Sequence, residues 1–421
     1  MHVCMVLPDP YPPDIRVTKE ARALLDAGHE VSLLCRGQPE AADRETVDGI
    51  DVVRLGESAP RDRAARLGSA ACNLATGAHP RWALAIRRLV RERDADVVHV
   101  HDLPLVRTAL WALRGSDPAL DVPVVADLHE NFPEAVRQWR RPHFEGEGTG
   151  DLGVRVDALF NPISRWKRIE RAVLPQVDRV LTVCEEAARH YHRDCRVLPA
   201  RTTVVGNTVD LKGFDAEADP ADEYADADEF LVTYVGGFGP HRGLETAIEG
   251  IAAADAEGKS EGGPEPHLLL VGAGADRHRE QLEALISELG VDDRVTFTGW
   301  VDFEDVPRYM AASDACLVPH ASTPHTDTTV PHKLFQYMAV GAPVIVSDVP
   351  PLKRIVEETE SGLVVPADDG EAMGEAISTL ASDSEEASRL GENGREAVRT
   401  KYNWGADAER LVATYEDLVG E

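Results

Sequence analysis

The sequence contains few cysteines, and they are scattered along its length. Six occur among 421 residues, with no C-x-x-C pair and no cysteine–histidine spacing of the kind that binds zinc. Disulfide frameworks and structural zinc sites depend on such clustering, so neither is supported. We expect reduced thiols that lie mostly in the core: Cys4, Cys35, Cys72, Cys184, Cys195 and Cys316.

Long apolar runs are also missing. No stretch approaches the roughly 20 apolar residues that a membrane-spanning helix needs. The first residues, MHVCMVLP, run directly into a strand-like segment rather than through a positively charged leader. These absences predict a cytoplasmic protein that is at most peripheral to the inner face of the membrane.

Basic residues, and lysine above all, are under-represented. Against 74 acidic residues there are 44 basic ones, of which seven are lysine and 37 are arginine, and the net charge is −30. A surface of this sign repels the phosphates of nucleic acids, so no nucleic-acid partner is expected. Dense charge hydrates a surface and salt screens its self-repulsion, which predicts a halophilic protein.

Two windows run against this acidic composition. Residues 61–93 hold eight arginines, and residues 165–174 are also basic. Helix faces whose arginines pair with nearby acids would explain both windows. The alternative is a surface that meets anionic lipid headgroups or a lipid-linked phosphate, and the sequence leaves both explanations open.

Apolar, strand-like runs alternate with segments of helical period along the whole chain. This alternation indicates an α/β fold built on parallel sheets covered by helices. Strands are expected at HVCMVLP, HEVSLLC, DVVHVH, VPVVADLH and VDRVLTVC in the first half, and at EFLVTYVGG, HLLLVGAGA, RVTFTGWV, ACLVPH, APVIVSD and GLVVP in the second.

The length of the chain exceeds what one hydrophobic core usually serves, so two domains are expected. An acidic stretch poor in large apolar residues, 211–228, separates them as a hinge. We therefore predict two doubly wound, Rossmann-like domains at 1–210 and 229–395. A ligand is expected in the cleft at the carboxyl ends of their strands.

A glycine loop follows the first strand of the second half, in VGGFGPHRGLETAIEGIA. Gly236 and Gly237 permit a ligand to approach the backbone, and Arg242 supplies a cation able to hold a phosphate with two hydrogen bonds. The alternative is an ordinary glycine turn. Because an arginine at a helix start opposes the helix dipole, the pattern favours phosphate binding.

The segment PHKLFQYMAVGAPVIVSD, residues 331–348, predicts a helix that begins with His332 and Lys333 and carries Gln336 one turn later. A helix start gathers free backbone N–H groups and positive dipole, so a lysine there makes a seat for a diphosphate. Taken alone, the pattern fits equally well an ordinary connection whose lysine points to water.

A third glycine turn occurs in VGAGADRH. It superficially suggests a dinucleotide-binding loop, but the third glycine and the acid expected further along the chain are missing. Gly272 and Gly274 are therefore expected to shape a turn beside the same ligand.

Histidine and carboxylate residues close two strands of the first half. His101 is followed by Asp102, and His129 is followed by Glu130. Such pairs in a cleft can orient a ligand hydroxyl or move a proton, although histidines that only cap strands are common. We expect this role for His129 rather than for His101.

The loop PYPPDIRVTKEARAL offers three further polar residues, Asp14, Arg16 and Glu20. The simplest interpretation is an Arg16–Glu20 ion pair along a helix. A part in binding the second substrate stays open.

In these motifs the chain resembles the retaining glycosyltransferases of family 4, which have the GT-B fold. In the first half the resemblance lies in PPDIRVTKEARALLDAGHEV, DLHENFPE, VDRVLTVCEEAARHY and VVGNTVDLKGF. In the second half it lies in YVGGFGPHRGLETAIEGI, HLLLVGAGADRHREQLEALISELGVDDRVTFTGWV and PHKLFQYMAVGAPVIVSD. The last segment, 396–421, resembles the terminal helix of the family, which usually crosses back to the first domain.

The resemblance implies transfer of a sugar from a nucleotide diphosphate donor to a hydroxyl of a glycan or lipid-linked acceptor, with the anomeric configuration retained. Arg242 and Lys333 match the family's basic diphosphate ligands, and Gly237 would lie near the phosphates. The backbone at Trp300 and Val301 would lie near the base.

The acceptor would bind the first domain, with His129 near the transferred sugar. In the mechanism that the resemblance implies, the leaving phosphate takes the proton of the acceptor, so neither a nucleophile nor a cofactor nor a bound metal is expected. Catalysis would then depend on cations and on positioning. The acidic pair Asp226 and Asp228 in the hinge is interpreted as solvated charge rather than as a metal site.

The chain also departs from the family. The family's two glutamates, separated by seven residues, would fall on Thr328 and Gln336. Gln336 can hydrogen-bond a hydroxyl but cannot supply negative charge to a developing oxocarbenium ion. Asp327 would substitute only if its loop shifts, and the arginine often found at the position of Gly237 is absent. Two alternatives therefore stay open: a sugar-nucleotide-binding protein without catalysis, and a GT-B epimerase that acts on the sugar nucleotide.

Overall fold

The architecture is taken from a computed structural model, which describes residues 1–38, 41–56, 72–73, 76–115, 117–140, 161–225, 228–257 and 264–420. Outside the described residues lie 61–71, 74 and 75 of the basic window and Asp226 of the hinge. The described chain forms two parallel-strand sheets with interleaved helices, so the predicted α/β fold is confirmed.

The first sheet has eight strands in the order β3-β4-β2-β1-β5-β6-β7-β8. Neighbouring strands are parallel except for the antiparallel pair of β3 and β4. The strands are β1 (His2–Pro10), β2 (Glu30–Arg36), β3 (Arg44–Val47), β4 (Ile50–Leu55), β5 (Val97–His101), β6 (Val124–Leu128), β7 (Arg179–Thr182) and β8 (Thr202–Val204).

All five strands expected in the first half exist, but the sequence interpretation missed β3, β4 and β8. The signal for the first two was present: Asp48 and Gly49 join them, with φ angles of 51° and 85°. An Asp-Gly pair with positive φ at both positions is the typical two-residue turn of a hairpin. For β8, only three residues long, the pattern is too short to distinguish from a loop.

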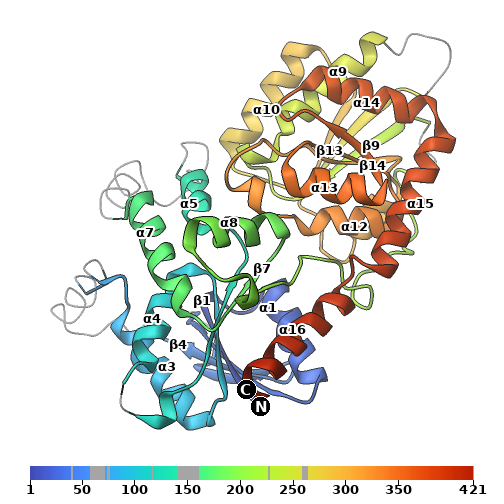
Figure 1. Ribbon diagram of the computed structural model, residues 1–421. Coiled ribbons are helices and arrows are strands. Elements are labelled where there is room, and N and C mark those ends of the chain that lie inside the picture. The colour runs from blue at the N-terminus through green and yellow to red at the C-terminus, as the bar shows by residue number, and fades with distance from the viewer. Residues whose placement is uncertain are drawn as a thin grey trace. The chain divides into compact units, whose positions relative to one another are not determined.

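Helices cover both faces of this sheet, and Figure 1 shows α3 and α4 on one face and α1 and α16 on the other. Asp14 caps α1, where its Oδ1 accepts from the backbone N–H of Val17 at 3.0 Å. The helices are α1 (Ile15–Asp26), α3 (Pro80–Arg93), α4 (Leu103–Leu113), η1 (Pro118–Leu120), α5 (Phe132–Trp139), α7 (Ile163–Val173), η3 (Leu174–Gln176), α8 (Glu185–Cys195), η4 (Pro199–Arg201) and α16 (Trp404–Gly420).

The second sheet has six parallel strands in the order β11-β10-β9-β12-β13-β14. All six were predicted, because each is a short apolar run rich in β-branched residues. They are β9 (Phe230–Val235), β10 (Pro266–Val271), β11 (Val295–Gly299), β12 (Ala315–Val318), β13 (Val344–Ser347) and β14 (Gly362–Val365).

Helices also cover both faces of the second sheet, with α9, α10 and α14 on one face and α12 and α13 on the other (Figure 1). An apolar core lies between this sheet and the helices that cover it, and Tyr234, Leu268 and Ile345 contribute to it. The helices are η5 (Pro240–Arg242), α9 (Leu244–Glu257), α10 (Asp276–Leu289), α11 (Val306–Ala311), η6 (Thr326–Thr328), α12 (His332–Val340), α13 (Pro350–Thr359), α14 (Gly370–Ser382) and α15 (Ser384–Thr400).

The chain divides into two compact units. The first contains the described parts of Met1–Arg137, Gly153–Val205 and Asp407–Glu421, and the second those of Gln138–Leu152 and Gly206–Ala406. The greater part of α16 therefore belongs to the first unit. No helix within the described ranges combines the length and apolar character needed to cross a bilayer.

The arginines of α3 are largely paired within the first unit. Arg88 lies beside Glu92, while Arg91 pairs with Asp117, which follows β5 and α4 in the chain. For residues 76–93 of the basic window, these contacts support the explanation that the arginines form local ion pairs. All six cysteines are free, and Cys72 alone among them is half-exposed rather than buried.

Candidate active site

The first polar cluster lies where the order of the second sheet reverses. From β9 the chain proceeds to β10 on one side, whereas β12 and β13 follow on the other. The loops after β9 and β12 diverge at such a reversal, which is the usual ligand position in doubly wound sheets. Arg242 lies in the loop after β9 and His320 in the loop after β12.

Gly243 allows these two loops to lie against each other. Its φ is +66°, and a Cβ atom there would approach the backbone oxygen of Pro319 to 1.7 Å. No other residue would fit without moving the backbone. The backbone N–H of Ala321 also donates to the carbonyl of His241 at 3.2 Å. Arg242 is thus held beside the end of β12.

The guanidinium of Arg242 is oriented by a neutral acceptor. Its Nη1 donates to Nε2 of His320 at 3.2 Å. Burial, and then the charges of Arg242 and Lys333, hold the pKa of His320 well below its ordinary value. His320 therefore orients the arginine without neutralising it. Sequence reasoning missed this residue, although a histidine just after a buried strand is the signal that drew attention to His129.

Lys333 is the second residue of α12 and is only 9% exposed. Its Nζ lies 3.6 Å from the centroid of the Tyr234 ring. A Cβ atom at Gly236 would approach that Nζ to 2.9 Å, so the glycine leaves the room that the ammonium occupies. Burial, and then Arg242, hold the pKa of Lys333 well below its ordinary value.

The structure brings Arg242 and Lys333 together, since each acts electrostatically on His320 and Arg242 acts on Lys333. Neither makes an ion pair with an acid anywhere in the described part of the chain, and Nζ of Lys333 has no hydrogen-bond partner there. Among the described residues the two cations thus lack an acidic partner, although the sequence contains 74 acidic residues. Buried charge without a partner is costly, so this cluster is suited to an anionic ligand.

The turn at Gly272 and Gly274 packs directly against the Gly236 loop. Gly272 has a φ of +134°, and a Cβ atom there would lie 2.2 Å from the carbonyl oxygen of Gly236. At Gly274 an added Cβ would approach Phe238 to 2.6 Å. Gly237 differs, because an added Cβ would meet nothing nearer than a backbone oxygen at 3.9 Å. Close packing therefore explains the first two glycines but not Gly237.

Trp300 and Val301 follow β11 at the same end of this sheet, since the N–H of Gly272 donates to the carbonyl of Gly299 at 3.0 Å. Trp300 is 81% exposed, and such exposure of the largest aromatic side chain is unusual. His332 and Gln336 stand one turn apart on α12, and both are half-buried.

Thr328 stands at one of the two positions where the family's glutamates would fall. The hydroxyl of Thr328 is buried and donates to the backbone carbonyls of Pro324 at 3.0 Å and His325 at 3.1 Å. Asp327 accepts from the hydroxyl of Ser322 at 3.2 Å, and burial raises its pKa. Thr328 is thus satisfied inside its own turn.

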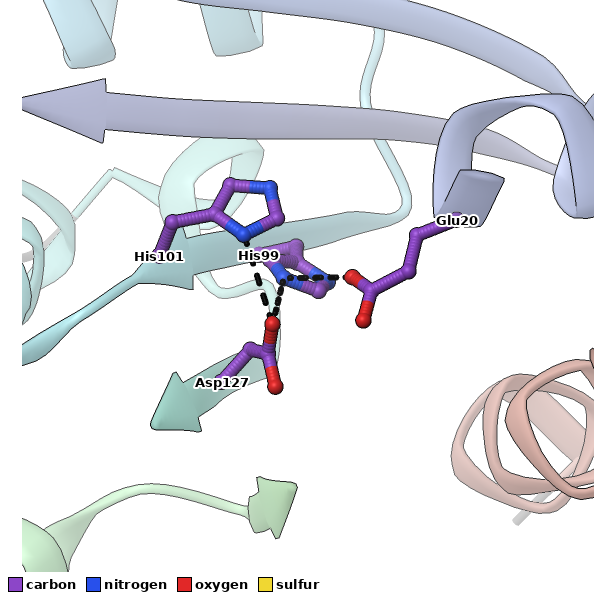
Figure 2. A group of neighbouring side chains, drawn as sticks. All are labelled: Glu20, His99, His101 and Asp127. Atoms are coloured by element: carbon purple, nitrogen blue, oxygen red, sulfur yellow. Dashed lines mark ion pairs between the residues drawn. The ribbon is translucent and has the colours of Figure 1, made fainter. Parts of the chain in front are cut away.

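The second polar cluster lies in the first unit, at the corresponding reversal between β1 and β5. His99 and His101 are two residues apart in β5, so both side chains project from one face of the sheet. Asp127 of β6 is the register partner of His101. Figure 2 shows both histidines facing this carboxylate, while Glu20 of α1 faces His99. All four side chains are fully buried.

Arg16 pairs with both acidic side chains of this cluster. Its Nη2 lies 2.7 Å from Asp127 Oδ1 and 2.9 Å from Glu20 Oε1, and its Nε donates to Asp127 Oδ2 at 3.0 Å. The predicted Arg16–Glu20 pair exists, but it is buried and includes Asp127. Burial would raise the pKa of Asp127, yet Arg16 and His129 hold it well below its usual range. Burial raises the pKa of Glu20 to about 8.

His129 follows β6 and lies between two carboxylates. Its Nε2 is 2.7 Å from Asp127 Oδ2, and its Nδ1 is 3.5 Å from Asp102 Oδ2. Burial alone would lower the pKa of His129, but Asp102 and Asp127 raise it to about 10. The imidazole is therefore a cation at neutral pH, and 18% of its side chain is exposed.

The backbone of Asp102 is strained in a way that serves this contact. Its φ is +58°, which a residue with a side chain rarely adopts. In this conformation Oδ1 of Asp102 accepts from the backbone N–H of His129 at 3.2 Å. His101 also approaches His129, with 3.2 Å between Nδ1 and Nε2. His101, which the sequence favoured less than His129, thus contacts His129.

Four residues of this cluster offer ligand atoms close enough for a metal ion: Glu20, His99, His101 and Asp127. Arg16 already supplies positive charge to both carboxylates, and a divalent cation beside its guanidinium would be repelled. The electrostatics therefore favour a neutralised side-chain network over a metal site. Tyr415 of α16 completes this network through a hydrogen bond to Nδ1 of His99.

Comparison with known families agrees with this architecture. Residues 15–212 match the family described as Glycosyltransferase Family 4, and residues 215–397 match Glycosyl transferases group 1. The alpha-D-kanosaminyltransferase of Streptomyces kanamyceticus is 25% identical over 342 residues, which cover 80% of this chain and 81% of that protein. The phosphatidyl-myo-inositol mannosyltransferase of Mycolicibacterium smegmatis is 24% identical over 96% of this chain and 89% of its own length.

Solved structures share the fold over the whole chain. Sucrose-phosphate synthase from Thermosynechococcus elongatus superposes with a TM-score of 0.75 at 24% identity, covering 100% of this chain and 99% of that one. Anabaena HepE in complex with UDP-glucose gives a TM-score of 0.64 at 15% identity, covering 99% of each chain. The matched families and this shared architecture establish that the chain is a glycosyltransferase and belongs to family 4 with the GT-B fold.

Proposed function

We propose that the protein moves a sugar from a nucleotide diphosphate donor to an acceptor hydroxyl and retains the anomeric configuration. The observation that carries this proposal is the pair of Arg242 and Lys333, which lie together without an acidic partner among the described residues. A diphosphate is the donor group that such a pair would recognise.

In the proposed reaction the bond between the anomeric carbon and the diphosphate oxygen breaks as the acceptor oxygen bonds to the same face of that carbon. The proton of the acceptor hydroxyl passes to the leaving diphosphate. Negative charge grows on the diphosphate as the bond breaks, and Arg242 and Lys333 stabilise it there. Both cations are already positioned, so little reorganisation is needed during the reaction.

The supports of the two cations suit this role because they carry no negative charge. His320 orients Arg242 as a neutral acceptor, and the Tyr234 ring holds the Lys333 ammonium through its π face. Either support replaced by a carboxylate would neutralise a cation before the donor arrives. The positive charge that a metal would supply to a diphosphate is available from these side chains, which supports our proposal of a metal-independent reaction.

For the remaining parts of the donor we propose positions at the same end of the second sheet. Gly236, Gly237, Gly272 and Gly274 would border the phosphates and sugar, where short side chains leave room. The exposed Trp300 and its neighbour Val301 would contact the base, and His332 and Gln336 would hydrogen-bond hydroxyl groups. Because HepE was solved with UDP-glucose, a uridine nucleotide is the first donor to test.

For the acceptor we propose a glycan or lipid-linked hydroxyl near His129 in the first unit. The cationic imidazole would donate a hydrogen bond to a hydroxyl of the transferred sugar or acceptor. A relative named for phosphatidyl-myo-inositol motivates the lipid-linked class. Leu84 of α3 is 69% exposed and Trp111 of α4 is 50% exposed, and these are the side chains we propose for peripheral contact at the cytoplasmic face of a membrane.

The experiment is a turnover assay with a panel of uridine, guanosine and adenosine diphosphate sugars and glycan or glycolipid acceptors, read by mass spectrometry. It is run at low and at high salt, because the acidic composition motivates our proposal of a halophilic enzyme. Arg242→Ala and Lys333→Ala are each expected to lower kcat by about 10²–10³-fold, as loss of one preorganised donor typically does.

Three results would count against the proposal. Unchanged turnover in both variants would remove the diphosphate role of the cations. Donor binding without any product across the panel would favour a non-catalytic sugar-nucleotide-binding protein, for which the replaced glutamate at Thr328 gives a reason. An isomeric sugar nucleotide formed without acceptor would identify an epimerase.

A further inference from the structure

We propose that Tyr415 is a positioning residue for His129, acting from the C-terminal helix through His99 and Asp127. Its role in the reaction rests on the function proposed above, whereas its effect on His99 does not. No local sequence pattern links the two side chains, because Tyr415 and His99 are 316 residues apart in the chain.

The contact between Tyr415 and His99 is direct and fully buried. The phenol hydroxyl lies at hydrogen-bond distance from Nδ1 of His99, and the two rings are stacked at 8° with centroids 6.2 Å apart. Both side chains have no solvent exposure. Asp407, two turns earlier on α16, is also fully buried and acts electrostatically on Arg16. Helix α16 thus presents two polar residues to this network.

The surroundings of His99 define which nitrogen carries its proton. Nε2 lies 3.8 Å from Oδ2 of the ionised Asp127 and 3.5 Å from Oε2 of Glu20. A proton on Nε2 is attracted to the Asp127 carboxylate, whereas a lone pair there would be repelled. Nδ1 must then be the acceptor, and the Tyr415 hydroxyl must be the donor. Burial raises the pKa of Tyr415 and lowers that of His99, so this hydroxyl stays protonated and the imidazole stays neutral.

Tyr415 therefore fixes the tautomer of His99 that supports Asp127, and Asp127 contacts His129 at 2.7 Å. Without the hydroxyl, Nδ1 would lose its donor at a fully buried position, and a shift of the proton to Nδ1 would turn a lone pair toward the Asp127 carboxylate. The negative charge of Asp127 would then be less well supported, and so would the position of the His129 cation. The charged and titratable groups that face His99 are Arg16 and Glu20 of α1, His101 of β5, Asp127 of β6, His129 beyond it and Tyr415 of α16.

The test combines nuclear magnetic resonance with kinetics on the full chain. Imidazole nitrogens are labelled with ¹⁵N, and the His99 signals are assigned by their loss in His99→Gln. The wild-type protein is expected to show neutral His99 with its proton on Nε2. Tyr415→Phe is expected to move that proton to Nδ1, at least in part, and to lower kcat about tenfold with the donor KM unchanged, a change of the size expected for one hydrogen bond.

Tyr11→Phe is the matched control. Tyr11 is 1% exposed in the same unit, and its hydroxyl bonds to that of Thr18 at 3.0 Å rather than to a histidine. It should leave both readouts unchanged. In a His99→Gln background, Tyr415→Phe should have no further effect on kcat, since the residue acts through His99.

The outcomes separate this proposal from the proposed function. An unchanged His99 tautomer in Tyr415→Phe, or a wild-type proton on Nδ1, overturns the inference whether or not the enzyme turns over. A changed tautomer with unchanged kcat overturns the connection to His129. If the wild type transfers no sugar in any assay, the reaction proposal fails, and the nitrogen signals still decide the role of Tyr415 at His99.

Discussion

The two units of the molecule place polar side chains at the same topological position and treat charge in opposite ways. In the first unit, Arg16 and His129 are matched by Asp127 and Asp102, so buried charges neutralise one another. In the second unit, Arg242 and Lys333 meet no acid in the described residues. A neutralised network holds its own geometry, whereas an uncompensated one gains stability when an anion binds.

The difference also explains how each cluster uses histidine. His129 becomes a cation because two carboxylates face it, while burial and the two cations that face it keep His320 neutral. Histidine is thus charged at the strand end in the first unit and neutral at the strand end in the second. A neutral His320 leaves Arg242 its full charge for a ligand, and a charged His129 completes the neutralisation of its network.

The largest effect on stability is expected in the first unit. Asp127→Asn would remove the one carboxylate that contacts both Arg16 and His129, two largely buried cations. Removing one partner of a buried charge network costs about 3–5 kcal/mol, and we expect a loss of that size in the free energy of unfolding measured with denaturant. Glu92→Gln, which removes one carboxylate from an exposed network with Arg44 and Arg88, should cost no more than about 1 kcal/mol. Equal losses of unfolding free energy in Asp127→Asn and Glu92→Gln would contradict the distinction between a buried and an exposed charge network.

A smaller effect of opposite sign is expected in the second unit. Lys333→Met removes a buried ammonium that has no acidic partner, and methionine can occupy its volume. The ligand-free protein should therefore become more stable, by roughly 1 kcal/mol, even as activity is lost. Lys353→Met, at an exposed lysine of α13, is the control and should change stability by less than about 0.5 kcal/mol. Destabilisation in Lys333→Met would mean that the lysine is structurally compensated after all.

The sequence predicted the parts of this architecture that local pattern determines. Eleven strands were identified from apolar runs, and the α/β class followed from their alternation with helices. The hairpin of β3 and β4 was not predicted, although Asp48 and Gly49 carry its signature. The sequence contained the information, and the interpretation overlooked it.

Contacts between distant segments could not be predicted in the same way. Arg242 and Lys333 were each suggested by a local motif, but the approach of their loops depends on the position of β9 beside β12 in the sheet. His320 was missed because its role appears only once Arg242 is beside it. His99 stands in an apolar run of the sequence that is typical of a buried strand, and no local pattern connects a buried histidine to a tyrosine 316 residues away.

The most direct measurement is the affinity of the ligand-free protein for inorganic pyrophosphate and for UDP, by titration calorimetry at two salt concentrations. The uncompensated cations should bind both ligands, and Arg242→Ala and Lys333→Ala should each weaken binding by about 10–100-fold, because a charge-assisted hydrogen bond contributes about 1.5–3 kcal/mol. Binding of equal strength in the wild type and both variants would contradict the account, since it would show that the diphosphate is recognised elsewhere.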